Sequence, residues 1–305
     1  MTDFFRDLAQ FFVPVFVISS MLNVGLTQRP TKLVEHLSNW HYLVRMVVVN
    51  LLVVPAVMVF ALELVDVAPA YESALVLFGM CAGAPFLIKL TRASQRDLAL
   101  GATVLLVLMT ATVVIVPLLL PRLIEGLDVD AWAIARALLL QMIAPMIGGM
   151  ILAEVVTSVS AWIQPWVARL SSIALYVLLG STIIGFGGEM GDRDLWKAIA
   201  LGLVVLAVAF MLGFMMGDGR DHLKDVGGLS TAQRGMPAAV IVATSNFDDT
   251  RVFVLVNVLN VIGIIGLLVV AKILSRDNRI ELTPTGADPP RRDRDRGTRR
   301  VTAPD

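Results

Sequence analysis

The sequence predicts an all-α polytopic membrane protein, and its composition and hydropathy pattern both support that fold class. The 305 residues are 57% hydrophobic and 16% charged, with a mean hydropathy of +0.78. A soluble domain has about 45–50% apolar and about 25% charged residues. The apolar residues also gather in runs of about 20, the length that a helix needs to cross the hydrocarbon core.

Nine such runs follow one another along the chain, so about nine transmembrane helices are expected. They are 8–26, 42–62, 72–90, 98–120, 131–155, 166–187, 196–216, 226–246 and 251–274. Residues 1–275 are therefore assigned to one transmembrane domain. Residues 276–305 contain eight arginines and few apolar residues, which predicts a disordered cytoplasmic tail.

The distribution of basic residues predicts the orientation in the membrane. With the N-terminus outside, the cytoplasmic segments hold fifteen Lys and Arg residues and the outer segments hold five. Those cytoplasmic segments are 27–41, 89–97, 156–165, 217–225 and 275–305. Because cytoplasmic loops are enriched in basic residues, we expect a multi-pass protein of the plasma or inner membrane with its C-terminus in the cytoplasm.

Several classes of function are not supported by the sequence. The net charge is zero, so nothing indicates a nucleic-acid partner. The single cysteine, Cys81, excludes an intrachain disulfide and a multi-cysteine metal site. The chain has no Gly-x-Ser-x-Gly or His-Glu-x-x-His motif and no intramembrane pair of aspartates, so an enzyme is not expected.

The third and eighth runs are interrupted, in GMCAGAPFLIKLTRASQRD (79–97) and GGLSTAQRGMPAAVIVATSNF (227–247). Both pass from an apolar helix through glycine or proline into a polar or basic cluster. Interruptions at matching places in two halves of a chain indicate an inverted-repeat transporter whose discontinuous helices form the binding site. Unwound backbone is tolerated at membrane depth only inside protein or beside a cavity, so we expect the two breaks to cross at such a site.

The basic residues of these segments have competing interpretations. Apolar sequence follows Gln233 and Arg234, and a central Arg costs about 2.5–3.5 kcal/mol on insertion scales, so a functional role is favoured. Lys89 fits a binding role and a helix end equally well. Arg92 and Arg96 are more typical of side chains that snorkel to the membrane surface.

These stretches resemble the bile acid:sodium symporter superfamily, as a divergent bacterial-type member. GMCAGAPFLIKLTRASQRDLALG (79–101) is similar to the family's Cys- and Gly-rich stretch. STAQRGMPAA (230–239) stands where the family has a crossover motif with an acid, Gly, any residue, Gln and Asn. VVVNLLVVPAV (47–57) and FFVPVFVISSMLNVGL (11–26) resemble two further helices. The resemblance implies core and panel domains, two crossing discontinuous helices, nine helices in place of ten, and sodium-driven transport of a small organic anion across the bilayer.

The chain departs from the family at the implied sodium sites. Leu87 and Ile88 replace Ser and Asn, and Leu229 replaces the acid, whereas hard cations such as sodium prefer several oxygen ligands. Asn50 and Gln233 keep their ligand character. Ser230 and Thr231 are candidate additional ligands. Sodium bound at a residual site and a proton therefore both remain as alternatives for the ion that drives transport.

Two hypotheses concern the cations near the crossing. The ammonium of Lys89 replaces the missing ion and makes transport proton-linked, since burial lowers the pKa of a lysine; normal transport by Lys89→Met at all pH values would contradict this. Arg234, with Lys89 and Arg45, makes the cavity electropositive for an anion, although Arg45 lies near the start of its run and is more typical of a side chain that snorkels to the membrane surface. Alternatively, Arg234 pairs with an acid such as Glu63 or Asp218, or caps helix carbonyls.

Two other functions stay open on the sequence. The loss of sodium ligands is also typical of an uncoupled facilitator, or of a receptor-like membrane protein that retains the fold. Metalloid efflux through Cys81 is less favoured, because the motif that accompanies it in the arsenite-efflux branch of the superfamily is absent.

Overall fold

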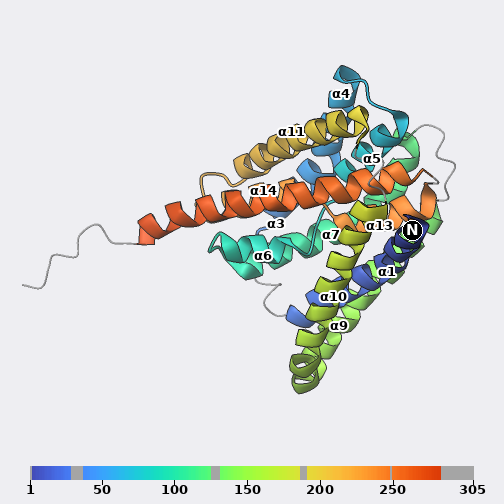
Figure 1. The fold of residues 1–305 in the computed structure, drawn as a ribbon. Coiled ribbons are helices and arrows are strands. Elements are labelled where there is room, and N and C mark those ends of the chain that lie inside the picture. The colour runs from blue at the N-terminus through green and yellow to red at the C-terminus, as the bar shows by residue number, and fades with distance from the viewer. Residues whose placement is uncertain (1, 29–36, 125–130, 186–190, 248, 283–305) are drawn as a thin grey trace, which may run out of the picture.

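The computed structural model describes residues 2–28, 37–124, 131–185, 191–247 and 249–282, which form helices joined by short connections (Figure 1). Seven of the helices in these ranges are long and apolar enough to cross a membrane. Two further segments are broken into shorter helices. The chain is therefore an all-α polytopic membrane protein, as its composition predicts.

The first half of the described chain contains α1 (Thr2–Thr27), α3 (Trp40–Val48), the π-helical turn η1 (Val49–Val53), α4 (Val54–Leu64), α5 (Pro69–Met80), α6 (Leu87–Ala93) and α7 (Leu98–Leu123). The second half contains α8 (Ala131–Leu138), the π-helical turn η2 (Leu139–Ile143), α9 (Ala144–Val155), α10 (Thr157–Gly185), α11 (Arg193–Met215), α12 (Asp221–Ala232), α13 (Met236–Asn246) and α14 (Thr250–Leu282).

Both interrupted segments are broken helices whose breaks meet, as predicted. The first break lies between α5 and α6, and the second lies between α12 and α13. The amide of Gly235 donates to the carbonyl oxygen of Cys81 (2.8 Å), and Ala82 and Arg234 form an antiparallel bridge. The two broken helices therefore cross at their unwound residues.

Small residues and one hydroxyl allow the backbone to unwind at this crossing. Gly83 has a φ of 75°, a conformation that favours glycine. A Cβ at Gly235 would lie 2.9 Å from the carbonyl oxygen of Ala82. The Oγ of Thr112 on α7 accepts from the amide of Ala82 (3.1 Å) and donates to its carbonyl (3.0 Å). One side chain thus satisfies both polar groups of an unwound, buried residue.

The helices divide into a panel and a core. The panel consists of α1, α9 and α10, which pack together below the other helices in Figure 1. Gly25 of α1 and Gly149 of α9 permit this contact, because a Cβ on Gly149 would lie 2.7 Å from the backbone oxygen of Leu22. The core contains the two broken helices together with α7, α11 and α14.

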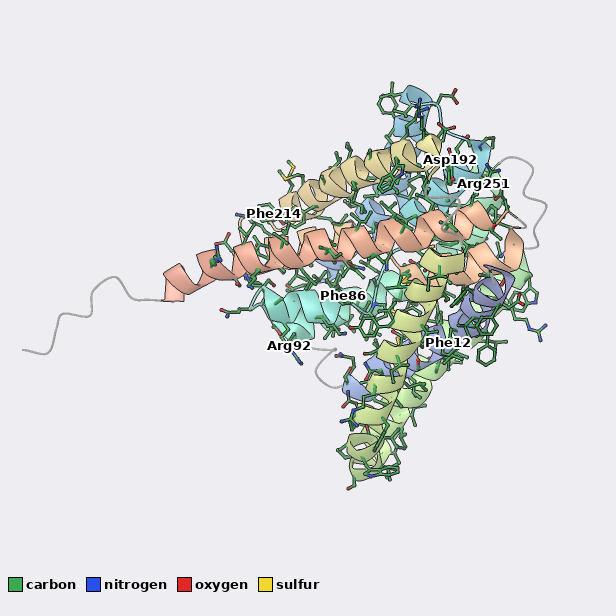
Figure 2. All side chains as sticks on the ribbon, viewed as in Figure 1. Phe12, Phe86, Arg92, Asp192, Phe214 and Arg251 are labelled. Atoms are coloured by element: carbon green, nitrogen blue, oxygen red, sulfur yellow. The ribbon has the colours of Figure 1, made fainter. Side chains whose placement is uncertain are left out.

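Contacts between described connections bring together some of the loops that the sequence assigns to one side. At one end, the Tyr71 hydroxyl donates to Asp192 (2.9 Å), and the Arg251 guanidinium lies 5.8 Å from the Tyr71 ring; Figure 2 shows Asp192 and Arg251 close together. At the other end, Arg96 pairs with Asp225 (2.7 Å). Tyr71, Asp192 and Arg251 therefore lie at one end of the helices, and Arg96 and Asp225 lie together at the other.

Two expected boundaries differ in the structure. Residues 156–165, expected to be a loop, are helical from Thr157 onward, because the chain reverses at Val156 alone and α10 then packs along α1. The Gln164 amide donates to Asn23 of α1 (3.1 Å), which fixes this early start. The last helix, α14, continues to Leu282 into the segment expected to be a tail, whose remaining residues lie outside the described part.

We predict that Thr112→Val lowers the midpoint of thermal unfolding of the detergent-solubilised protein by several degrees. The reason is that each buried backbone group left unsatisfied costs about 1–3 kcal/mol. Thr110→Val is the matched control, since Thr110 is exposed on the same helix. Equal midpoints for the two variants would show that the hydroxyl of Thr112 does not stabilise the break.

Candidate functional site

The guanidinium of Arg234 lies at the centre of the helix crossing, where its side chain is 1% exposed. Its Nε donates to the carbonyl of Phe78 (3.3 Å), and its Nη2 donates to the carbonyls of Gly79 and Asn50 (3.0 Å for Asn50). Its Nη1 donates to the carbonyl of Thr231 and to Oδ1 of Asn50, both at 3.1 Å. All five acceptors are uncharged oxygens.

The position of these acceptors explains why a cation is held there. Phe78 and Gly79 lie in the last turn of α5, and Thr231 lies in the last turn of α12. The final carbonyls of a helix have no intrahelical partner and carry partial negative charge. A guanidinium has five N–H donors in a planar fork, so Arg234 caps both helix ends at once.

Asn50 reaches this guanidinium from the π-helical turn η1. Its Nδ2 donates to the Oγ of Thr231 (3.1 Å), and Thr231 in turn donates to the carbonyl of Gly227 (2.8 Å). Asn50, Thr231 and Arg234 are therefore brought together in one buried network, which joins the segment of α3, η1 and α4 to the crossing.

The two remaining candidates of this segment lie apart from that network. Ser230 donates to the carbonyl of Gly227 within its own helix (3.1 Å) and is not among the residues that bind Arg234. Gln233 is 3% exposed and lines a cavity beside the crossing. Its Oε1 is buried and has no hydrogen-bond partner in the described part of the chain.

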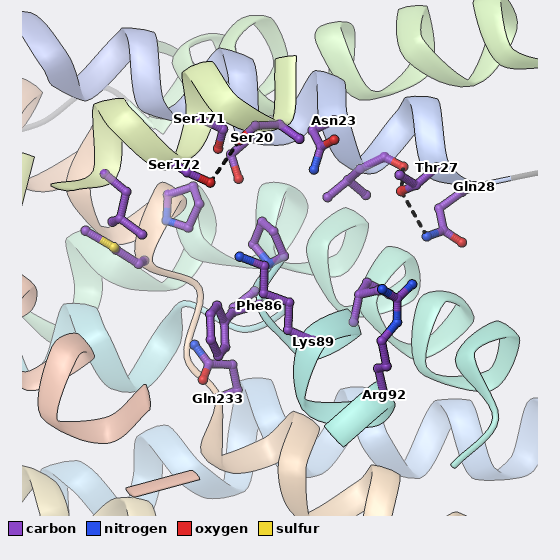
Figure 3. Close-up of a pocket in the computed structure, with 18 of the residues that line it drawn as sticks. Ser20, Asn23, Thr27, Gln28, Phe86, Lys89, Arg92, Ser171, Ser172 and Gln233 are labelled. Carbon is purple, nitrogen blue, oxygen red and sulfur yellow. Dashed lines mark hydrogen bonds between the residues drawn. The ribbon is translucent and has the colours of Figure 1, made fainter. Parts of the chain in front are cut away.

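The cavity lies between the panel and the core and has a volume of about 640 Å³. Its panel wall comes from α1, the residue that follows it and α10, and contains seven polar side chains: Ser20, Asn23, Thr27, Gln28, Gln164, Ser171 and Ser172. Its core wall comes from the crossing, α6 and α14 and includes Phe86, Lys89, Arg92, Gln233, Met236 and Asn260. In Figure 3, Lys89 and Arg92 extend from the core wall toward the serines and amides of the panel wall.

The cations of the cavity differ from those expected. Lys89 lines it with an exposed side chain whose Nζ is 5.3 Å from the Phe86 ring centroid, and Arg92 lines it one turn later. Arg234 is buried in the crossing, and Arg45 pairs with Asp218 at the surface. Neither arginine lines the cavity, so the alternatives of a surface position for Arg45 and of carbonyl capping for Arg234 agree with the structure.

The hypothesis that the ammonium of Lys89 replaces an ion at the crossing does not fit the structure. Its ammonium projects into the cavity, and Arg234 is the cation that the crossing oxygens bind. Those oxygens do not fit a sodium ion at the same place, since they already accept hydrogen bonds from a guanidinium. Leu229, at the position of the family's acid, is fully buried and supplies no oxygen ligand.

Cys81 is fully buried beside the crossing. In the part of the chain that the structure describes, no group of three or more His, Cys, Asp or Glu residues is placed to hold a metal. Metalloid binding therefore gains no support from the surroundings of the thiol.

Sequence reasoning missed three parts of this site. Thr112 was overlooked because isolated threonines are common in membrane helices. Arg92 was assigned to the membrane surface, although its spacing of three from Lys89 places both on one helix face. The polar wall of α1 carries its own signal, since Ser20, Asn23 and Thr27 recur every three or four residues in an apolar helix.

No curated protein matches the chain. The model of the Sodium Bile acid symporter family matches residues 14–191, which is more than half of the chain and includes α9, α10, the second half of α1 and the first broken helix. The second broken helix lies beyond the match, and the structure places it against the first. On this evidence the chain belongs to the sodium bile acid symporter family.

Proposed function

We propose that this protein is a secondary transporter that carries a small organic anion through the cavity between panel and core. The observation that carries the proposal is the pair of cationic side chains, Lys89 and Arg92, on one wall of a cavity about 640 Å³ in volume. Cavities of about 300–1,000 Å³ accommodate small molecules. The description of the family, a symporter of bile acid and sodium, agrees with an anionic substrate.

The chemistry of the walls suggests how the anion is recognised. Lys89 and Arg92 offer charge-assisted hydrogen bonds to a carboxylate or sulfonate. Apolar groups such as Phe16, Val24 and Leu175 line the same cavity and suit a hydrophobic body. Hydroxyl and amide groups of the panel face the two cations and suit substrate hydroxyls. An amphipathic organic anion fits this combination better than a small inorganic anion does.

Gln233 connects the cavity to the crossing. It lines the cavity, and its Nε2 lies 3.5 Å from the carbonyl oxygen of Arg234. A buried amide oxygen without a partner costs about 1–3 kcal/mol. We propose that Oε1 gains a donor when substrate is bound or when the panel moves against the core, which would link binding to the crossing.

The cavity lies toward the end of the molecule that carries Arg92 and Asp97. We propose that this end faces the cytoplasm, with the N-terminus outside and the C-terminus inside, because its loops and the tail hold most of the basic residues. In that orientation the described conformation is open inward. Transport then requires the panel to move relative to the core, since broken helices permit such rocking around a fixed site.

The coupling ion is a separate question from the substrate. A proton-linked mechanism through Lys89 stays a hypothesis, but its exposed side chain lacks the burial on which that hypothesis depended. We therefore propose that Lys89 binds the anion. An uncoupled facilitator would use the same cavity, and accumulation of substrate above the external concentration would distinguish an active transporter from it.

We predict that Lys89→Gln and Arg92→Gln each raise the KM for a transported anion about tenfold, the effect of losing about 1.4 kcal/mol of binding. The measurement is uptake of labelled cholate and of a set of shorter carboxylates into proteoliposomes. Lys197→Gln is the control, because Lys197 pairs with Asp194 on α11 and does not line the cavity.

An unchanged KM in both cavity variants would remove the support for anion binding at this wall. A pH profile recorded on Lys89→Gln tests the proton hypothesis in the same experiment. Loss of the wild-type pH dependence, with substrate affinity retained, would support proton coupling over our assignment of Lys89.

The proposed orientation predicts that a fluorescent protein fused to the C-terminus fluoresces in intact cells, because it folds in the cytoplasm. A C-terminal alkaline phosphatase fusion is expected to be inactive, since that enzyme needs the disulfide-forming environment outside the cytoplasm. The opposite pair of results would invert the orientation and make the described conformation outward-open.

A further inference from the structure

We infer that Arg234 is a tethered cation: its guanidinium occupies a monovalent-cation site built by the two crossing helices, in place of a dissociable coupling ion. The inference rests on the proposed function only for its consequence for transport. Its structural content concerns what the crossing binds, and this can be measured without any substrate.

The oxygens around Arg234 have the chemistry of a cation site. Four backbone carbonyls and one side-chain amide oxygen accept hydrogen bonds from the guanidinium. Within the described chain, no carboxylate forms an ion pair with it. A charge buried without an opposite charge is costly unless oriented dipoles stabilise it. Carbonyl oxygens and the C-terminal ends of half-helices are the groups with which membrane proteins hold monovalent cations.

Those oxygens come mainly from the ends of two helices. Three come from the last turns of two helices that end at the crossing, α5 and α12, and two come from Asn50 on the neighbouring helix. The negative ends of two helix dipoles therefore point at one place. Both dipoles stabilise a positive charge at that place, whether it belongs to a free ion or to a side chain of the protein.

The cation at the crossing is covalently attached to the protein. Arg234 lies in the three-residue break between α12 and α13, and its guanidinium folds back onto Thr231 of the preceding helix. An arginine stays protonated in proteins, and its covalent attachment prevents the guanidinium from dissociating into solution. A tethered cation therefore stabilises the crossing permanently, whereas a free ion must bind and dissociate and so couples its gradient to transport.

The inference predicts that Arg234→Ala creates a site for free cations. In choline chloride, the purified variant is expected to unfold about 5 °C or more below the wild type. Millimolar guanidinium or sodium is expected to recover part of that loss by binding to the vacated oxygens. The wild type is expected to show no specific response to sodium over choline.

Two controls distinguish cation binding at the vacated site from general effects of salt or chaotrope on the stability of the protein. Arg45→Ala removes an arginine paired at the surface, with a side chain 45% exposed, and is expected to respond to added cations as the wild type does. Urea at the same concentration as guanidinium tests for the effect of a chaotrope without charge. If Arg234→Ala cannot be isolated, Arg234→Gln keeps the side-chain stem and removes the charge for the same measurement.

The inference is overturned if the Arg234 variants respond to no cation, or if millimolar sodium specifically stabilises the wild type. Stabilisation of an Arg234 variant by guanidinium or sodium, absent in the wild type and Arg45→Ala, supports it. Neither result depends on uptake. A failure of cholate and carboxylate transport would therefore contradict the proposed function and leave this test intact.

Discussion

The guanidinium of Arg234 binds two helix ends that are buried inside the protein. Such helix ends are the hardest backbone groups to stabilise in a membrane protein. Two helices end inside the protein, so the carbonyls of their last turns have neither helical partners nor water. A single side chain caps both ends and also binds Asn50 of a third helix. Without it, several backbone oxygens would be buried without donors, each at a cost of about 1–3 kcal/mol.

The position of the cavity wall depends on this crossing. Phe86 lies in the first break, Lys89 follows it and Gln233 lies in the second, so the core wall is positioned by the same contacts that stabilise the unwound backbone. The panel wall comes from α1 and α10, which pack on each other more extensively than on the core. Substrate groups would therefore lie between a fixed crossing and a separable panel, an arrangement suited to alternating access.

Much of this arrangement could be predicted from the sequence, because glycine and proline mark the breaks and basic residues mark the sides of the loops. The partners of Arg234 could not be predicted, since four of its five acceptors are backbone oxygens that no residue type identifies. Of the alternatives considered, capping of helix carbonyls is the one found. Asn50 comes within reach through a π-helical turn, and the start of α10 at Thr157 depends on its packing against α1.

The most direct test of this account is uptake of labelled cholate by the wild-type protein in proteoliposomes, with sodium or choline as the external cation at constant pH and membrane potential. Because Arg234 supplies the positive charge at the crossing, the initial rate is expected to be the same with either cation. A rate that rises about tenfold or more in sodium, a coupling free energy of about 1.4 kcal/mol, would show that a free ion is bound in the cycle and would contradict the account.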